Sequence, residues 1–213
     1  MDWFMVRPPL LARKILPEAV WSLSSEIKPP SVYLTFDDGP DPSVTPFVLD
    51  CLREYNAKAT FFLLGKNAEQ HPDMVRRILD EGHAIGNHGH SHLNGWTHSC
   101  SSYMADVQAA EKSISSKMYR PPYGRITWPQ YRQLSKTFKV VMWDVMSYDF
   151  HPRHDADRCV KNVLTNTRPG SIIVFHDNPK AFKNLLTALP RCLEEFEKKG
   201  WQCRALELEP FKD

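Results

Sequence analysis

Cysteine is scarce in this chain and follows no spacing typical of a metal site or a disulfide framework. The 213 residues include five cysteines, an odd number, and no two of them form a CxxC pair. We therefore expect reduced thiols and no zinc site built from cysteines.

Long apolar runs and clusters of one charge sign are also missing. No run reaches the length of a membrane-spanning helix, and no stripe of Lys and Arg with interleaved aromatics indicates a nucleic-acid partner. The first residues, MDWFMVRPPLLARKILPEAVWSL, lack the charged and apolar regions of a signal peptide. The sequence therefore predicts a cytoplasmic location without a transmembrane segment, and it leaves the oligomeric state open.

The composition and the apolar pattern favour one α/β domain. Hydrophobic residues make up 42% of the chain and charged residues 24%, and 17 prolines indicate many firmly bounded loops. From residue 31 onward, short apolar runs alternate with segments of helical period, as in repeated β/α units. We predict an N-terminal helical extension over residues 1–30 and a catalytic domain over residues 31–213. The expected strands, seven in number, are VYLTF, ATFFLL, HAIGN, KMYR, KVVMWDV, SIIVFH and CRALEL.

Titratable or charged side chains follow five of the expected strands or lie late in them. They are Asp37 with Asp38, His88, Arg120, Asp144 and His176. In a β/α barrel the carboxyl ends of the strands meet on one face, where active sites form. We therefore expect these side chains to share one site on that face.

Two adjacent carboxylates end the first expected strand, in the stretch VYLTFDDGP. Neighbouring carboxylates repel each other, so their burial is costly unless a cation or a proton-handling partner offsets the charge. In NHGHSHLNGW, His88 and His92 would share one face if the backbone turns helically after Asn87. Two imidazoles and one carboxylate suit zinc or a similar divalent ion, so we predict that these histidines and Asp38 bind a metal. Asp37 would then stay free to take a proton from water.

Five motifs, TFDDGP, HGHSH, RPPYG, MWDVMSYDF and VFH, occur in this order between residues 31 and 201. In order and spacing they resemble the motifs of the polysaccharide deacetylase, or NodB-homology, family of carbohydrate esterases. The resemblance implies a distorted (β/α) barrel of about seven strands. It also implies a metal-dependent hydrolase that removes N-acetyl, or sometimes O-acetyl, groups from a carbohydrate such as an N-acetylglucosamine polysaccharide or oligosaccharide. Zinc is the expected metal, with cobalt, nickel or manganese as alternatives.

The resemblance also implies roles for single residues. Asp37 looks like the catalytic base, held in place by Arg120, and His176 looks like the general acid that protonates the leaving amine. The main-chain N–H of Tyr123 would stabilise the oxyanion, and Val174 would wall the pocket for the acetyl methyl group.

Three positions depart from the family pattern. Gly89 stands where Ser or Thr usually follows the first histidine, Met146 stands where Asp is common, and Phe150 stands where Trp is common. Without a carboxylate at Met146 we expect a lower pKa for His176 than in relatives that carry Asp there. Asp144, two residues earlier on the same strand face, would be placed to compensate and to contact the substrate.

Two other functions remain open. One is a different C–N hydrolase on the same scaffold, such as a deformylase of a lipid-linked amino sugar or an imide-cleaving enzyme, which would differ in its acyl pocket. The other is a carbohydrate-binding protein with weakened catalysis, which the changes at Met146 and Phe150 would suit.

Other candidate residues are expected to play smaller parts. His90 should lie beside the metal loop and point away from the metal. Trp96 and Trp128 are either sugar-stacking platforms or core residues. The segment FHPRHDAD, residues 150–157, is interpreted as a solvated loop that caps the next helix rather than as a second metal site.

Overall fold

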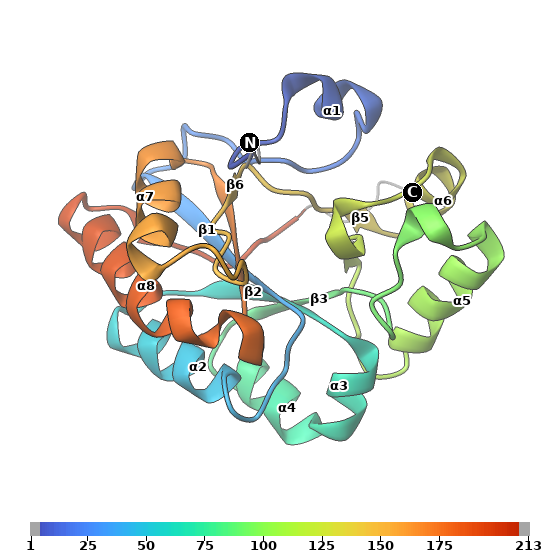
Figure 1. Ribbon diagram of the computed structural model, residues 1–213, viewed down its shortest axis with the longest axis horizontal. Helices are drawn as coiled ribbons and strands as arrows, with labels where there is room; N and C mark the ends of the chain where they lie inside the picture. The colour runs from blue at the N-terminus through green and yellow to red at the C-terminus, as the bar shows by residue number, and fades with distance from the viewer. Residues whose placement is uncertain (1–4, 209–213) are drawn as a thin grey trace.

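Seven parallel strands curl into an open, distorted barrel in the computed structural model, which describes residues 5–208 (Figure 1). Their order in the sheet is β5-β4-β3-β2-β1-β7-β6, and a short eighth strand, β8, pairs with β1. The predicted fold class is confirmed. The strands are β1 (Ser31–Asp37), β2 (Ala59–Leu63), β3 (Ala84–Asn87), β4 (Met118–Tyr119), β5 (Lys139–Val140), β6 (Val145–Met146), β7 (Ile172–His176) and β8 (Gln202–Cys203).

Helices follow most of the strands and cover the outside of the barrel (Figure 1). The short helix α3 lies in a segment for which the sequence pattern gave no helix, because two turns of helix show too little periodicity. The helices are α1 (Leu10–Ile15), α2 (Thr45–Glu54), α3 (Gly65–Gln70), α4 (Pro72–Asp80), α5 (Cys100–Ala110), α6 (Trp128–Leu134), α7 (Ala156–Asn166) and α8 (Pro179–Lys198), with 3₁₀ turns η1 (Gly95–Thr97) and η2 (Pro122–Gly124).

The central strand β1 is buried along its whole length. Val32, Leu34 and Phe36 belong to the core under the helices. Thr35 and Asp37 face the inside of the barrel, where one buried arginine donates hydrogen bonds to both. Because successive side chains of a strand point to opposite faces, this alternation directs Asp37 inward at the carboxyl end of the strand.

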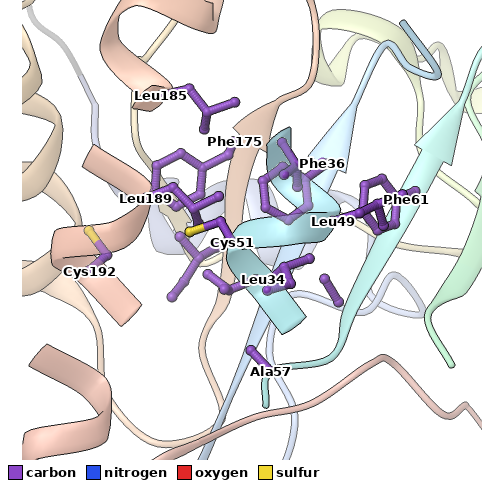
Figure 2. Packing of buried hydrophobic residues seen from close by; sticks show 14 of the residues in the cluster. Leu34, Phe36, Leu49, Cys51, Ala57, Phe61, Phe175, Leu185, Leu189 and Cys192 are labelled. Atoms are coloured by element: carbon purple, nitrogen blue, oxygen red, sulfur yellow. The ribbon is translucent and has the colours of Figure 1, made fainter. Parts of the chain in front are cut away.

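Stacked aromatic rings join the neighbouring strands β2, β1 and β7 beneath the helices (Figure 2). The ring centroids of Phe36 and Phe61 lie 5.1 Å apart, and those of Phe36 and Phe175 lie 6.0 Å apart. Leu185 and Leu189 of α8 pack in the same cluster. This packing holds β1, β2 and β7 together, so it also fixes the relative positions of the groups at their carboxyl ends.

The N-terminal segment spans the gap between the two edges of the sheet. Met146 of β6 donates its N–H to the carbonyl of Val6, and Met142 donates its N–H to the carbonyl of Val20 at 2.8 Å, next to β5. Helix α1, between these two contacts, lies outside the layer of the other helices (Figure 1). Only Leu10–Ile15 of the expected helical extension is helical, and residues 1–4 lie outside the described residues. The division into an extension over residues 1–30 and a domain over residues 31–213 stays a prediction.

Two strand predictions are wrong. The stretch over residues 139–145 is not one strand, because β5 ends at Val140, β6 begins at Val145, and the two lie at opposite edges of the sheet. The expected strand CRALEL is mostly irregular, since β8 ends at Cys203. The five cysteines are free thiols, as expected. No helix within residues 5–208 is long and apolar enough to cross a membrane.

Candidate active site

A tight turn after β1 separates the two adjacent carboxylates. Asp38 has a left-handed backbone, with φ of 81°, so its side chain leaves the strand in a different direction from that of Asp37. The next residue, Gly39, donates its N–H to Asp177 Oδ1 at 3.0 Å. A Cβ at Gly39 would overlap the Asp177 carboxylate, so the turn requires glycine there.

Asp37 is held by Arg120, which follows β4. The Arg120 guanidinium donates to Asp37 Oδ1 at 2.7 Å and to the carbonyl of Met142 at 2.9 Å. It is fully buried, and it lies over the ring of Phe62 at 4.1 Å from the centroid. An arginine stays protonated in such a site, so it supplies a fixed positive charge that orients and compensates the Asp37 carboxylate.

Asp38 faces two imidazoles instead of a cationic side chain. Its Oδ1 lies 3.1 Å from His92 Nε2 and 3.6 Å from His88 Nε2. This oxygen is buried and accepts no hydrogen bond, although the second carboxylate oxygen accepts one from Asn178 at 2.7 Å. One ligand atom from each of the three residues lies within 4.8 Å of the others. A buried carboxylate oxygen without a partner, facing two ring nitrogens, fits a divalent cation.

Local contacts keep His88 in the form that a metal requires. Its Nδ1 lies 2.7 Å from the carbonyl of Arg120, so Nδ1 carries the proton and Nε2 presents its lone pair to Asp38. Burial lowers the pKa of His88 to about 4, so the ring is neutral at pH 7. Burial opposes ionisation of Asp38, but the imidazoles of His92 and His176 hold the pKa of this carboxyl well below its usual range.

The backbone between the two histidines is a loop, so the expected helical turn is wrong. Gly89 and His92 both have positive φ, 77° and 59°, which folds the loop back and brings the two rings to 5.1 Å between centroids. Asp106 of α5 fixes the loop by accepting the N–H of His90 at 2.8 Å. The ring of His90 lies near α3 and points away from the site, as expected.

His176 ends β7 directly beside Asp37, its register partner on β1. Its Nδ1 lies 2.8 Å from Asp149 Oδ1, and its main-chain N–H donates to Asp149 Oδ2 at 2.8 Å. Burial opposes the charged form, but the Asp149 carboxylate outweighs it and raises the pKa of His176 to about 9. The expected difference from relatives that carry Asp at the position of Met146 stays a prediction, and the carboxylate beside His176 is that of Asp149 rather than Asp144. Sequence reasoning missed Asp149, although it stands inside the segment MWDVMSYDF.

Asp144 does not belong to this site, which corrects the prediction that it contacts substrate or supports the acid. It is fully buried and accepts hydrogen bonds from Arg7 at 2.8 Å, from Arg13 at 2.6 Å and from the hydroxyl of Ser171 at 2.7 Å. Ser171 precedes β7, whereas His176 ends it. Asp144 therefore lies at the opposite end of the strand and anchors the N-terminal segment.

Tyr123 and Val174 lie on two sides of the site. Tyr123, in η2, has φ of 59°, and its exposed ring meets the ring of His92 edge-on at 4.4 Å between centroids. Val174 lies two residues before His176 on β7, so both face the inside of the barrel, and it is fully buried. Their roles toward a substrate stay predictions.

Two polar residues directly after His176 were also missed, although they adjoin the motif VFH. Asp177 is fully buried and accepts the hydroxyl of Thr45 at 2.6 Å in addition to the Gly39 N–H. Burial raises the pKa of Asp177 well above its usual range. Asn178 holds the metal-facing carboxylate from behind. Both residues position the turn after β1.

The segment of residues 150–157 assembles no metal site. Among the residues that the structure describes, Asp38, His88 and His92 are the one group of His, Cys, Asp or Glu with metal-binding geometry. Asp155 instead caps α7 by accepting the N–H of Arg158 at 2.8 Å, as the helix-cap interpretation predicts.

Comparison with known proteins points to one family. The family model described as polysaccharide deacetylase matches residues 24–141. A peptidoglycan-N-acetylglucosamine deacetylase of Bacillus cereus is 38% identical over 188 residues, which cover 84% of this chain and 68% of that protein. A chitooligosaccharide deacetylase of Azorhizobium caulinodans is 37% identical over 156 residues, or 69% of this chain and 73% of that protein.

Solved structures agree with the sequence comparison. The Bc1960 peptidoglycan N-acetylglucosamine deacetylase has a TM-score of 0.80 at 34% identity, with 92% of this chain and 93% of that chain covered. A family 4 carbohydrate esterase of Streptomyces lividans, solved in complex with acetate, has a TM-score of 0.74 at 30% identity, with 84% and 93% covered. With the five motifs, the barrel and these matches, this chain belongs to the polysaccharide deacetylase family.

Proposed function

We propose that this protein is a metal-dependent hydrolase that removes the N-acetyl group from N-acetylglucosamine units of an oligosaccharide or polysaccharide. The observation that carries the proposal is the different surroundings of two adjacent carboxylates. Asp37 is paired with a buried arginine, whereas Asp38 presents an unpartnered oxygen to two imidazoles. The relatives named peptidoglycan and chitooligosaccharide deacetylases support the substrate class.

Asp38, His88 and His92 would hold the metal ion. When bound, the ion supplies positive charge beside the amide oxygen, where negative charge develops during attack by water. Zinc suits this set of one carboxylate and two imidazoles, with cobalt, nickel and manganese as alternatives.

Asp37 acts as the general base. It takes a proton from the attacking water, and the hydrogen bond from Arg120 keeps its carboxylate aimed at the site. The main-chain N–H of Tyr123 donates to the oxyanion that forms on the carbonyl oxygen. One such donor typically lowers the barrier by about 2.7 to 4 kcal/mol.

His176 acts as the general acid. Because Asp149 binds Nδ1, the imidazolium has Nε2–H available to protonate the leaving amine nitrogen, and a pKa of about 9 keeps it charged at neutral pH. The C–N bond then breaks to give acetate and the free amino sugar. Val174, below His176 in the barrel, would line the floor of the pocket for the acetyl methyl group.

The competing functions differ in what they would release. A weakened carbohydrate-binding protein was suggested by Met146, but Asp149 supplies the carboxylate that the acid requires, so the geometry favours an enzyme. A deformylase would prefer an N-formyl sugar over an N-acetyl sugar. The cytoplasmic location expected from the sequence stays a prediction that cell fractionation would check.

The test is release of acetate by metal-loaded protein. We would incubate it with N-acetylglucosamine oligomers, peptidoglycan fragments, acetylated xylan and N-formylglucosamine, with Asp37→Asn protein as the control. Acetate from either of the first two, absent with the variant, would support the proposal. Formate release alone, or no release from any substrate, would contradict it.

A further inference from the structure

Exposed side chains continue outward from the metal ligand His92. The ring of Tyr123 meets it edge-on at 4.4 Å, and the Arg125 guanidinium lies 6.0 Å from the centroid of the Tyr123 ring. The same guanidinium lies 5.0 Å from the centroid of the Trp96 ring. Trp96 is 64% exposed and Tyr123 is 59% exposed. A row of contacts therefore runs from the metal site to an exposed indole.

The Trp96 ring is held in place although it is exposed. Its main-chain N–H donates to the side chain of Asn94 at 3.0 Å, and its indole N–H reaches the carbonyl of Ile126 at 3.4 Å. The buried Gln130 donates to the carbonyl of Gly95 at 2.9 Å and so ties this turn to the start of α6. A ring that is already oriented loses little conformational freedom when a ligand packs on it.

The chemistry of Trp96 and Arg125 suits a sugar ring. The apolar C–H face of a pyranose packs on an indole, and the guanidinium offers N–H donors to hydroxyl and acetamide oxygens. Within residues 5–208 no carboxylate lies within ion-pair distance of Arg125, so its donors are not engaged by an acidic side chain. Stacking on the indole holds the guanidinium beside the exposed ring.

We propose that Trp96 and Arg125 form a second sugar subsite, which binds an N-acetylglucosamine ring next to the one whose acetyl group lies at the metal. Tyr123 contacts both His92 and Arg125, so the subsite lies next to the metal site. The ligand there would therefore be the next sugar ring of the same chain. The inference rests on the proposed function and specifies it: the protein acts on chains of two or more N-acetylglucosamine rings in preference to the single sugar.

The first test compares substrate lengths. We would measure kcat/KM for acetate release from the monomer and the pentamer of N-acetylglucosamine with the parent, Trp96→Ala, Trp96→Phe and Trp128→Ala. Trp128 is the matched control, because it is 51% exposed but its ring contacts Tyr131 outside the row. We expect Trp96→Ala to lower the pentamer-to-monomer ratio of kcat/KM by roughly five- to tenfold, the effect of losing one aromatic contact, and Trp96→Phe to restore most of it. The control should keep the parent ratio.

A binding measurement separates this inference from the proposed function. In the Asp37→Asn background, adding Trp96→Ala should raise the Kd for the pentamer by roughly five- to tenfold in isothermal titration calorimetry. Binding that depends on Trp96 without acetate release by the parent would leave the subsite standing and overturn the function. Acetate release with an unchanged ratio and Kd in Trp96→Ala, or an equal effect of Trp128→Ala, would overturn the subsite.

Discussion

Asp149→Asn tests the general acid most sharply, because it removes a charge while keeping nearly the same side-chain shape. In the parent, the Asp149 carboxylate binds both the ring and the main chain of His176. The amide of the variant can still accept the main-chain N–H. It no longer offers a negative charge to the imidazolium, so the pKa of His176 falls.

The expected size follows from the pKa of His176, which lies at about 9 against an ordinary value of 6.5. This difference corresponds to about 3 kcal/mol in favour of the protonated ring. If the pKa returns to 6.5, the protonated fraction at pH 8 falls from roughly nine-tenths to a few per cent, or about thirtyfold. Because the acid then loses its proton at a lower pH, the alkaline limb of activity moves down.

The assay is a pH series of kcat/KM for acetate release, with Met146→Asp as the comparison. Asp149 already provides a carboxylate that binds the His176 ring. A second carboxylate, in Met146→Asp, should therefore move the alkaline limb upward only slightly. This upward shift should be much smaller than the downward shift in Asp149→Asn. An alkaline limb unchanged in Asp149→Asn, with thermal unfolding like that of the parent, would refute the assignment of His176 as the acid.

Three further outcomes are expected. His92→Ala should lose most of the bound metal in elemental analysis, whereas His90→Ala, whose ring points away, should keep it. Asp144→Asn should lower the free energy of unfolding by about 1.5 to 3 kcal/mol in urea titrations, since it weakens hydrogen bonds to two partly exposed arginines, and an unchanged midpoint would contradict the anchoring role. Gly89→Ala should lower the unfolding free energy by roughly 1 to 2 kcal/mol and weaken metal binding, because a Cβ there is strained and meets the Asp106 carboxylate at 2.7 Å.

Much of the site could be predicted because its signals are local. Apolar runs of strand length ending in charged groups placed Asp37, Asp38 and His176 at the carboxyl ends of their strands, and alternation along β1 and β7 turns Asp37 and His176 into the barrel. The metal ligands Asp38, His88 and His92 could also be predicted, because they stand in two short sequence motifs. The conformation of the loop that assembles the metal site could not be predicted, because it depends on positive φ at Gly89 and at His92, and a histidine gives no sequence signal for that backbone.

The position of Asp144 depends on contacts that have no local signal. The apolar run around it has the pattern of one strand, yet the chain crosses there from one edge of the sheet to the other. Arg7 and Arg13, more than 130 residues earlier, are the groups that make its burial possible. Asp149 was missed for another reason. Asp149 lies three residues after Met146, in a segment without strand periodicity. Only the folded chain shows that its carboxylate turns back toward His176.

The measurement that tests the account most directly is metal content and acetate release in Asp37→Asn and Asp38→Asn, with an N-acetylglucosamine oligomer as substrate. We expect the parent to hold about one divalent ion per chain. Asp37→Asn should keep that ion and lose hydrolysis by roughly 10² to 10⁴, because it removes only the base, whereas Asp38→Asn should lose both. Equal metal loss in the two variants, or full activity in Asp37→Asn, would contradict the division of roles between the two carboxylates.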